Sequence, residues 1–205
     1  YDDYLHSLAG DERRDTARRE RKRREDQDVR IEAVRNVRDV PAAMDALVKW
    51  HQALWIGKGQ RGQFVDWPGF EAFHRRIAQR MAAEGNLLLV TLMVDGEPLG
   101  AAYGYHFGPR SHSMVRGYRD DDPWRRYALG RLLHCHMVEQ AIQRGSTVLD
   151  DGRGVFEYKL RLGGQLRGEQ SVTLVHRGFG SRLRFWAALR AAYLLHVVYC
   201  RIWFD

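Results

Sequence analysis

Cysteine is scarce in this sequence, and its scarcity excludes several classes of protein. The 205 residues include only Cys135 and Cys200, so neither a disulfide framework nor a cysteine-rich metal site is expected. No Cys-x2-Cys or His-x3-His pair occurs, and His134 and His136 lie two positions apart in a helical pattern, where they point to different faces. We therefore expect no metal ion, and we expect a reducing, cytoplasmic location.

Other functional motifs are missing as well. No Gly-x-Ser-x-Gly occurs and Cys135 lies in mid-helix, so a serine or cysteine nucleophile has little support. The loop GKGQRG at 57–62 lacks the Walker spacing of a nucleotide-binding P-loop. The apolar tail at 185–204 is about as long as a membrane span, but Arg190 and Arg201 make crossing costly. We expect this tail to be a helix that covers the core or else makes a peripheral membrane or partner contact.

Lysine is also rare, so the positive charge comes almost wholly from arginine. The formal net charge is +7, and lysine occurs only at positions 22, 49, 58 and 159. Residues 11–26 hold eight Arg or Lys with Ala17 as their only apolar residue, so they cannot present an apolar stripe to a core. This stretch is typical of a solvated or linking helix. Contact with a neighbouring domain and binding to nucleic acid or anionic lipid are the alternatives.

Hydrophobic periodicity predicts a mixed α/β chain. We expect residues 1–26 to be a basic lead-in helix or linker and residues 27–205 to form one domain, an α/β (α+β) fold whose mostly antiparallel sheet is flanked by helices and followed by an extra C-terminal helix. The predicted strands are 28–34, two within 86–108, 111–118, 147–150 and 168–176, and the predicted helices are about 40–56, 67–84, 128–144, 155–162 and 181–204.

The stretch 147–164 is the most informative part of the sequence. A short strand ends at Asp150 and Asp151, a glycine turn follows, and Tyr158 and Lys159 then lie on a short helix. The carboxyl ends of strands are where α/β proteins place ligands. A helix cap with a local Asp-Arg ion pair explains the same residues equally well.

A second candidate lies where loop 119–127 leads into a helix. The free backbone N–H groups and the dipole of a helix start attract anions. Gly130 offers close approach to the backbone, and arginines at 125, 126 and 131 offer forked hydrogen bonds. This helix start is therefore a possible phosphate site.

Three stretches of the chain are informative together, namely FEAFHRRIAQRMAAEGNLLLVTLMVDGEPLGAAYGYHFG (70–108), YALGRLLHCHMVEQAIQRG (127–145) and LDDGRGVFEYKLRLGG (149–164). In this order they resemble the GNAT acyltransferase superfamily, in the branch shared by Fem-type peptidyltransferases and acetyltransferases of bacterial cellulose biosynthesis. The chain departs from the usual pattern of this branch in having Ala128-Leu129 where Ser-Pro is common and Asp151 where an aromatic residue is common. Tyr158 and Lys159 match it.

The resemblance implies transfer of an acyl group from acetyl-CoA or another acyl-CoA to an amine or hydroxyl. Tyr158 would donate a proton to the leaving thiolate, Lys159 would stabilise negative charge and Asp150 would orient the acceptor. The general base stays open among Asp150, Asp151, Glu157 and His106. The implied donor-binding residues are Arg116, Gly117, Arg125, Arg126, Leu129, Gly130 and Arg131.

The resemblance also implies partners and alternatives. A small-molecule or saccharide acceptor, a role in bacterial polysaccharide or cell-envelope biosynthesis, and an upstream domain of the same chain are expected. A Fem-type protein would instead transfer an aminoacyl group from tRNA, which the basic helix at 13–24 would contact. A third possibility is a catalytically degenerate domain that serves as an interaction module.

Overall fold

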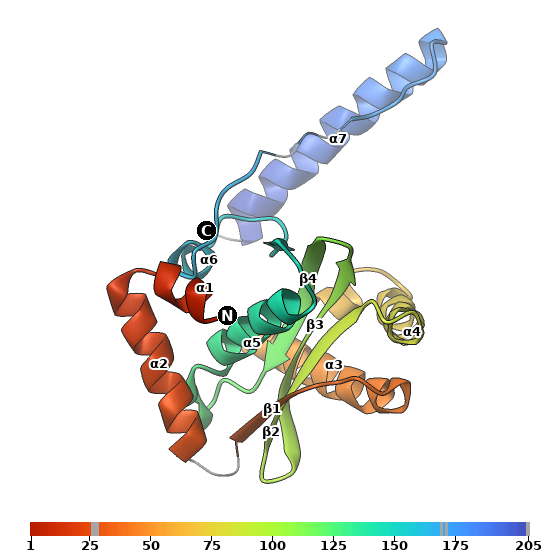
Figure 1. The fold of residues 1–205 in the computed structure, drawn as a ribbon. Helices are drawn as coiled ribbons and strands as arrows, with labels where there is room; N and C mark the ends of the chain where they lie inside the picture. Colours follow the sequence, from red (N-terminus) through yellow and green to blue (C-terminus); the bar gives the residue numbers. More distant parts are fainter. Residues whose placement is uncertain (26–28, 169, 171, 204–205) are drawn as a thin grey trace. The chain divides into compact units, whose positions relative to one another are not determined.

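The computed structural model describes residues 1–25, 29–168, 170 and 172–203, and its contacts divide the chain into two units, 1–165 and 166–205 (Figure 1). The first unit contains every strand assigned in the described residues. Its helices are α1 (Asp2–Ser7), α2 (Gly10–Glu25), α3 (Val40–Ile56), α4 (Phe70–Ala83), α5 (Leu129–Gln143) and α6 (Glu157–Arg161). Its strands are β1 (Val29–Ala33), β2 (Leu87–Val94), β3 (Glu97–Phe107), β4 (Arg110–Tyr118) and β5 (Val148–Asp150).

The five strands form one sheet in the order β1-β2-β3-β4-β5. The first four are antiparallel neighbours, and β5 runs parallel to β4 because α5 intervenes between them. Asp95 and Gly96, with φ of 49° and 78°, make the tight turn from β2 to β3. The predicted mixed, mostly antiparallel sheet with flanking helices is confirmed.

Helices cover both faces of this sheet (Figure 1). Leu87 and Leu89 of β2 pack in one cluster with residues of α3 and α4. The alternate residues Leu88 and Val90 pack in a second cluster with residues of α5. Since side chains alternate across a strand, burial on both faces explains why β2 reads as a continuous apolar run.

At Gly117 the backbone of α3 lies close to β4. A Cβ at this position would lie 2.3 Å from the backbone nitrogen of His51 and 2.6 Å from the carbonyl oxygen of Leu47. His51 Nδ1 also bonds the Arg116 carbonyl at 2.9 Å, which fixes the helix against the strand. Gly117 therefore permits helix packing on the face of β4 that carries α3.

The C-terminal region differs from the sequence expectation. No strand is assigned to the described residues of 168–176, and Val172 and Leu174 are 83% and 94% exposed. Alternating polarity favours a strand, but a strand also needs a partner ladder, and this segment has none in the described structure. The predicted strand at 168–176 is therefore wrong.

The second unit consists of residues 166–205, with α7 (Phe179–Trp203) as its helix. Among the described residues of α7, several apolar side chains are exposed, with Phe179 and Leu195 at 83% and 69% exposure. Among the described residues, no helix combines the length and apolar character needed to cross a bilayer.

The N-terminal helices lie within the first unit. Contacts divide the chain after residue 165 rather than near residue 26, where the sequence analysis placed a boundary. Residue Thr16 of α2 is 1% exposed and Glu12 is 6% exposed. The interpretation of this stretch as a solvated helix is therefore corrected: α2 buries a polar face instead of an apolar one.

We predict that Gly117→Ala destabilises the protein by about 3 kcal/mol, because the new methyl group meets backbone that cannot move aside without shifting α3. The midpoint of urea unfolding measures this change. Gly10→Ala is the matched control, since its Cβ would lie at an ordinary 3.5 Å from the Arg14 guanidinium. Equal midpoints for the two variants would contradict the packing role of Gly117.

Candidate active site

The ladder between β4 and β5 ends early. It pairs Arg110–His112 with Val148–Asp150, whereas β4 continues to Tyr118. In the described structure, residues 113–118 of β4 therefore have no ladder partner on the β5 side. An unpaired strand edge presents backbone N–H and C=O groups to any extended ligand that lies beside it.

A cavity of about 310 Å³ lies next to this edge. Arginines from four elements reach it, namely Arg19, Arg116, Arg131 and Arg161 of α2, β4, α5 and α6. We name this positively charged space the arginine-rich cavity. Its remaining lining residues are Tyr118, Ala128, Gly130, His134, Tyr158 and Leu162.

Arg116 and Tyr158 form the centre of this wall. The guanidinium carbon lies 4.7 Å from the centroid of the Tyr158 ring, and Nη2 donates a hydrogen bond to the phenol oxygen. Burial raises the pKa of Tyr158, while the Arg116 charge acts in the opposite direction. Tyr158 therefore keeps its proton at neutral pH and holds it beside a fixed cation.

His134 and Asp151 continue the cluster behind Arg116. Asp151 Oδ2 lies 3.6 Å from Arg116 Nη2, and Asp151 Oδ1 lies 3.6 Å from His134 Nδ1. Burial lowers the pKa of His134 to about 4, so its ring is neutral near pH 7, although the carboxylate favours its protonation. From the sequence alone, His134 stands out only as a possible metal ligand. Its position between the apolar residues Leu133 and Met137 is the signal that could have placed it on an inward-facing helix surface.

Lys159 does not face this cavity. Its ammonium donates to the carbonyl oxygens of Asp151 at 2.7 Å, Gly152 at 3.1 Å and Arg153 at 3.0 Å. The side chain thereby closes the turn that follows β5. This contact differs from the charge-stabilising role that the resemblance implied for Lys159.

The candidates for the general base are spread over the site. Asp150 accepts a hydrogen bond from the Gly152 N–H at 2.8 Å and lies 3.5 Å from His112. Glu157 pairs with Arg161 on the same helix, and His106 bonds the Ser146 hydroxyl at 2.9 Å. Two of these four contact residues that line the cavity: Asp151 contacts Arg116 and His134, and Glu157 contacts Arg161.

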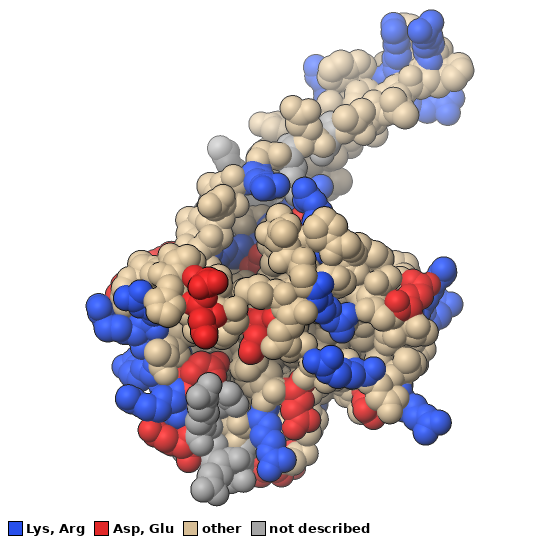
Figure 2. Space-filling model, in the orientation of Figure 1, with Lys and Arg blue, Asp and Glu red and all other residues tan. Residues whose placement is uncertain are grey.

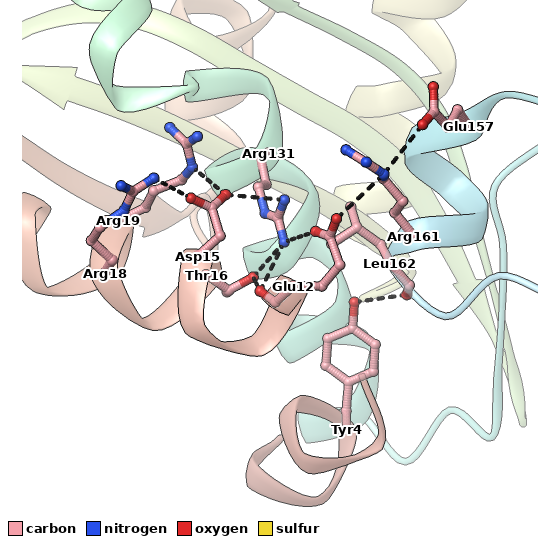
Figure 3. Close-up of polar contacts among 10 residues, drawn as sticks. All are labelled: Tyr4, Glu12, Asp15, Thr16, Arg18, Arg19, Arg131, Glu157, Arg161 and Leu162. Atoms are coloured by element: carbon pink, nitrogen blue, oxygen red, sulfur yellow. Dashed lines mark hydrogen bonds and ion pairs between the residues drawn. The ribbon is translucent and has the colours of Figure 1, made fainter. Parts of the chain in front are cut away.

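Arg131 is held by α2 (Figure 3). Its Nη2 lies 2.6 Å from Glu12 Oε2 and 2.7 Å from the Thr16 hydroxyl, and its Nη1 lies 3.3 Å from Asp15 Oδ2. Arg161 of α6 approaches the other Glu12 oxygen at 3.4 Å. The predicted phosphate-binding guanidinium is thus already paired with carboxylates of the N-terminal helix.

The remaining predicted donor residues fall in three places. A Cβ on Gly130 would lie 2.4 Å from the Tyr118 ring, so this glycine makes room for Tyr118. Leu129 is 1% exposed in the core. Arg125 and Arg126 line a neighbouring hollow rather than the cavity. The structure therefore gathers Arg116, Gly130, Arg131 and Tyr158 and leaves the other predicted residues apart.

No group of three or more His, Cys, Asp or Glu residues in the described chain is arranged to hold a metal ion.

Comparison with protein families supplies an independent result. A family model described as acetyltransferase (GNAT) domain matches residues 11–160. This chain belongs to the GNAT acetyltransferase family. The match begins inside α2 and ends inside α6, so it includes the residues that line the arginine-rich cavity except Arg161 and Leu162. No curated protein matches the sequence.

Solved structures with the same fold are distant in sequence. An aminoglycoside N-acetyltransferase in complex with CoA has a TM-score of 0.50 and 12% identity, covering 73% of this chain and 95% of that chain. A predicted acetyltransferase from Clostridium acetobutylicum with acetyl-CoA has a TM-score of 0.49 and 11% identity, covering 73% and 99%. An aminoglycoside acetyltransferase from an uncultured soil metagenomic sample, in complex with sisomicin, has a TM-score of 0.47 and 16% identity, covering 75% and 98%. The first of these structures, together with the family model, shows that this chain has the GNAT fold.

We predict that Arg131→Ala lowers the free energy of unfolding by about 3 kcal/mol, because it leaves the buried Glu12 carboxylate without its nearest cation. Chemical denaturation measures the loss. Adding Glu12→Gln to this variant should restore part of it. The matched control is Arg80→Ala, which removes an exposed ion pair with Glu84 and should leave the unfolding midpoint almost unchanged. Equal losses in the two arginine variants would contradict a structural role for the α2 contact.

We also predict that His134 makes stability depend on pH. Its pKa falls from 6.5 to about 4 on folding, so the unfolded chain binds the proton more readily. The stability that the neutral ring contributes is complete above about pH 6.5 and is lost as the pH falls toward 4. Replacing His134 with Gln should reduce the loss of unfolding free energy between pH 7.5 and pH 5 by up to about 2 kcal/mol. The exposed His6→Gln variant should keep the wild-type dependence, and a His134→Gln variant that also keeps it would refute the prediction.

Proposed function

We propose that this GNAT domain is an acyl-CoA-dependent N-acetyltransferase whose donor lies in the arginine-rich cavity. The observation that carries the proposal is the combination of an unpaired β4 edge with Arg116 and Tyr158 at one cavity wall. An acyl-CoA offers the matching groups, namely extended amides, a charged diphosphate and a thioester.

The pantetheine arm would lie along residues 113–118, where its amides pair with the free backbone groups of β4. The diphosphate would lie at the start of α5, because the first N–H groups of this helix lack partners within the helix. Arg19 and Arg161 border this end of the cavity and supply positive charge. In this arrangement Arg131 orients α2 rather than contacting phosphate directly.

The reaction requires an amine to attack the thioester carbonyl and a thiolate to leave. The nitrogen–carbon bond forms and the carbon–sulfur bond breaks. The attacking nitrogen gives up one proton to solvent, and the thiolate takes one from a donor that solvent then reprotonates. Tyr158 would donate that proton, since burial keeps its hydroxyl protonated near pH 7. Arg116, which bonds the same oxygen, would stabilise the negative charge that develops during transfer.

An amine acceptor is proposed over a hydroxyl because the similar structures include aminoglycoside N-acetyltransferases. A small molecule or saccharide that carries an amine fits this chemistry. Membership of the Fem-type and cellulose-biosynthesis branch, a role in the bacterial cell envelope, an upstream domain and a cytoplasmic location stay predictions from the sequence.

We predict that Tyr158→Phe lowers kcat about 100-fold with little change in the affinity for acetyl-CoA, because the variant loses the proton donor and keeps the ring. Titration calorimetry with acetyl-CoA gives the affinity, and release of free thiol with a panel of amines gives the rate. Tyr193→Phe, on exposed α7, is the control and should behave as the wild-type protein. Absence of acetyl-CoA binding by the wild-type protein would refute the proposed function.

A further inference from the structure

A second positively charged hollow, of about 320 Å³, lies beside the proposed donor cavity. Figure 2 shows Lys and Arg side chains grouped over α2, at the left of the view. All five residues that line the hollow are cationic: Arg18, Arg19 and Lys22 come from α2, and Arg125 and Arg126 come from the loop before α5. We name this group the cationic hollow.

The charges of the cationic hollow are only partly neutralised. Asp15 pairs with both Arg18 and Arg19, at 2.7 Å for Arg19. In the described part of the chain, no ion pair joins Lys22 or either loop arginine to a carboxylate. Like charges so close together repel one another, and a bound anion removes that repulsion. The hollow is therefore suited to a compact group with more than one negative charge.

Contacts hold the two sides of the hollow in place before any ligand arrives. Arg19 donates a hydrogen bond from α2 to the carbonyl oxygen of Arg126 at 3.4 Å. Lys22 and Arg126 both pack on the ring of buried Tyr127, at 5.4 Å and 4.8 Å from its centroid. Arg125 donates to the Asp120 carbonyl oxygen at 2.9 Å. Since these side chains are already ordered, less entropy is lost on binding.

The cationic hollow is also continuous with the donor cavity. Arg19 lines both, and Ala128 of the donor cavity follows the loop arginines closely in sequence. A donor whose diphosphate lies at the start of α5 would carry its nucleotide toward α2. In coenzyme A that nucleotide bears a 3′-phosphate, a compact dianion separate from the diphosphate.

We propose that the cationic hollow binds the 3′-phosphate of the acyl-CoA donor, so that α2 forms part of the donor site. This inference rests on the proposed function, because it requires an acyl-CoA in the neighbouring cavity. It assigns a binding role to Arg18, Lys22 and the two loop arginines. Donors with the phosphate are then preferred over donors without it.

The test compares acetyl-CoA with 3′-dephospho-acetyl-CoA by titration calorimetry on the full 205-residue chain. The wild-type protein should bind acetyl-CoA at least about tenfold more tightly, in keeping with charge-assisted hydrogen bonds to the phosphate. In the double variant Lys22→Ala/Arg126→Ala, acetyl-CoA should bind more weakly while the affinity for 3′-dephospho-acetyl-CoA stays the same. The two affinities should then be nearly equal. Lys22→Gln provides a milder variant, and thermal unfolding checks that both variants fold. Arg76→Ala, an exposed charge loss on α4, should retain the wild-type preference.

The possible results separate this inference from the proposed function. Equal wild-type affinities for the two donors, or variants that weaken both donors alike, would overturn the phosphate site while leaving an acyl-CoA enzyme. Failure of both donors to bind would overturn the two proposals together. If the variants lose binding of tRNA while the donor preference persists, the hollow is a nucleic-acid surface and the inference is wrong.

Discussion

The early end of the β4–β5 ladder is the constraint on which the candidate site depends. β5 pairs with the first three residues of β4, and no other described strand pairs with the rest of β4 on that side, which leaves backbone groups there for a ligand. If β5 were longer, the ladder would fill the space into which Arg116 and Tyr158 project. The glycine turn after β5 leads the chain away and then returns it as α6, and Lys159 fixes that return by donating to the turn carbonyls. A structural lysine thus positions its neighbour Tyr158 at the cavity.

The N-terminal helix is joined to this arrangement by ion pairs rather than by apolar packing. Glu12, Asp15 and Thr16 of α2 surround Arg131 at the start of α5 (Figure 3). Burying such charges is favourable only when each has a close partner, so this contact specifies where α2 lies. With its acidic face directed inward, α2 presents Arg18 and Lys22 to the loop arginines. The same helix therefore closes one side of the donor cavity and contributes to the cationic hollow.

These two features give the site two distinct electrostatic environments. Near Tyr158, a partly buried carboxylate lies between one guanidinium and a neutral histidine, which suits a single proton transfer. Near α2, Lys22 and the two loop arginines have no carboxylate partner among the described residues, which suits a multiply charged group. A long donor with a reactive thioester at one end and phosphates at the other matches that difference in charge along the cavity.

The sequence by itself determined the order of elements from β1 to α6 and the family resemblance. Those features depend on local periodicity, on turns such as Asp95-Gly96, and on motifs contiguous in the chain. The resemblance also named Tyr158 and Arg116 as candidate site residues. Only the tertiary structure decided which side chains meet. It paired Arg131 with Glu12, turned Lys159 toward carbonyl groups and brought His134 to Asp151, because these contacts join residues far apart in sequence or depend on side-chain direction. The predicted strand at 168–176 failed for a related reason: alternation of polarity is a local property, whereas a strand exists only where another strand pairs with it.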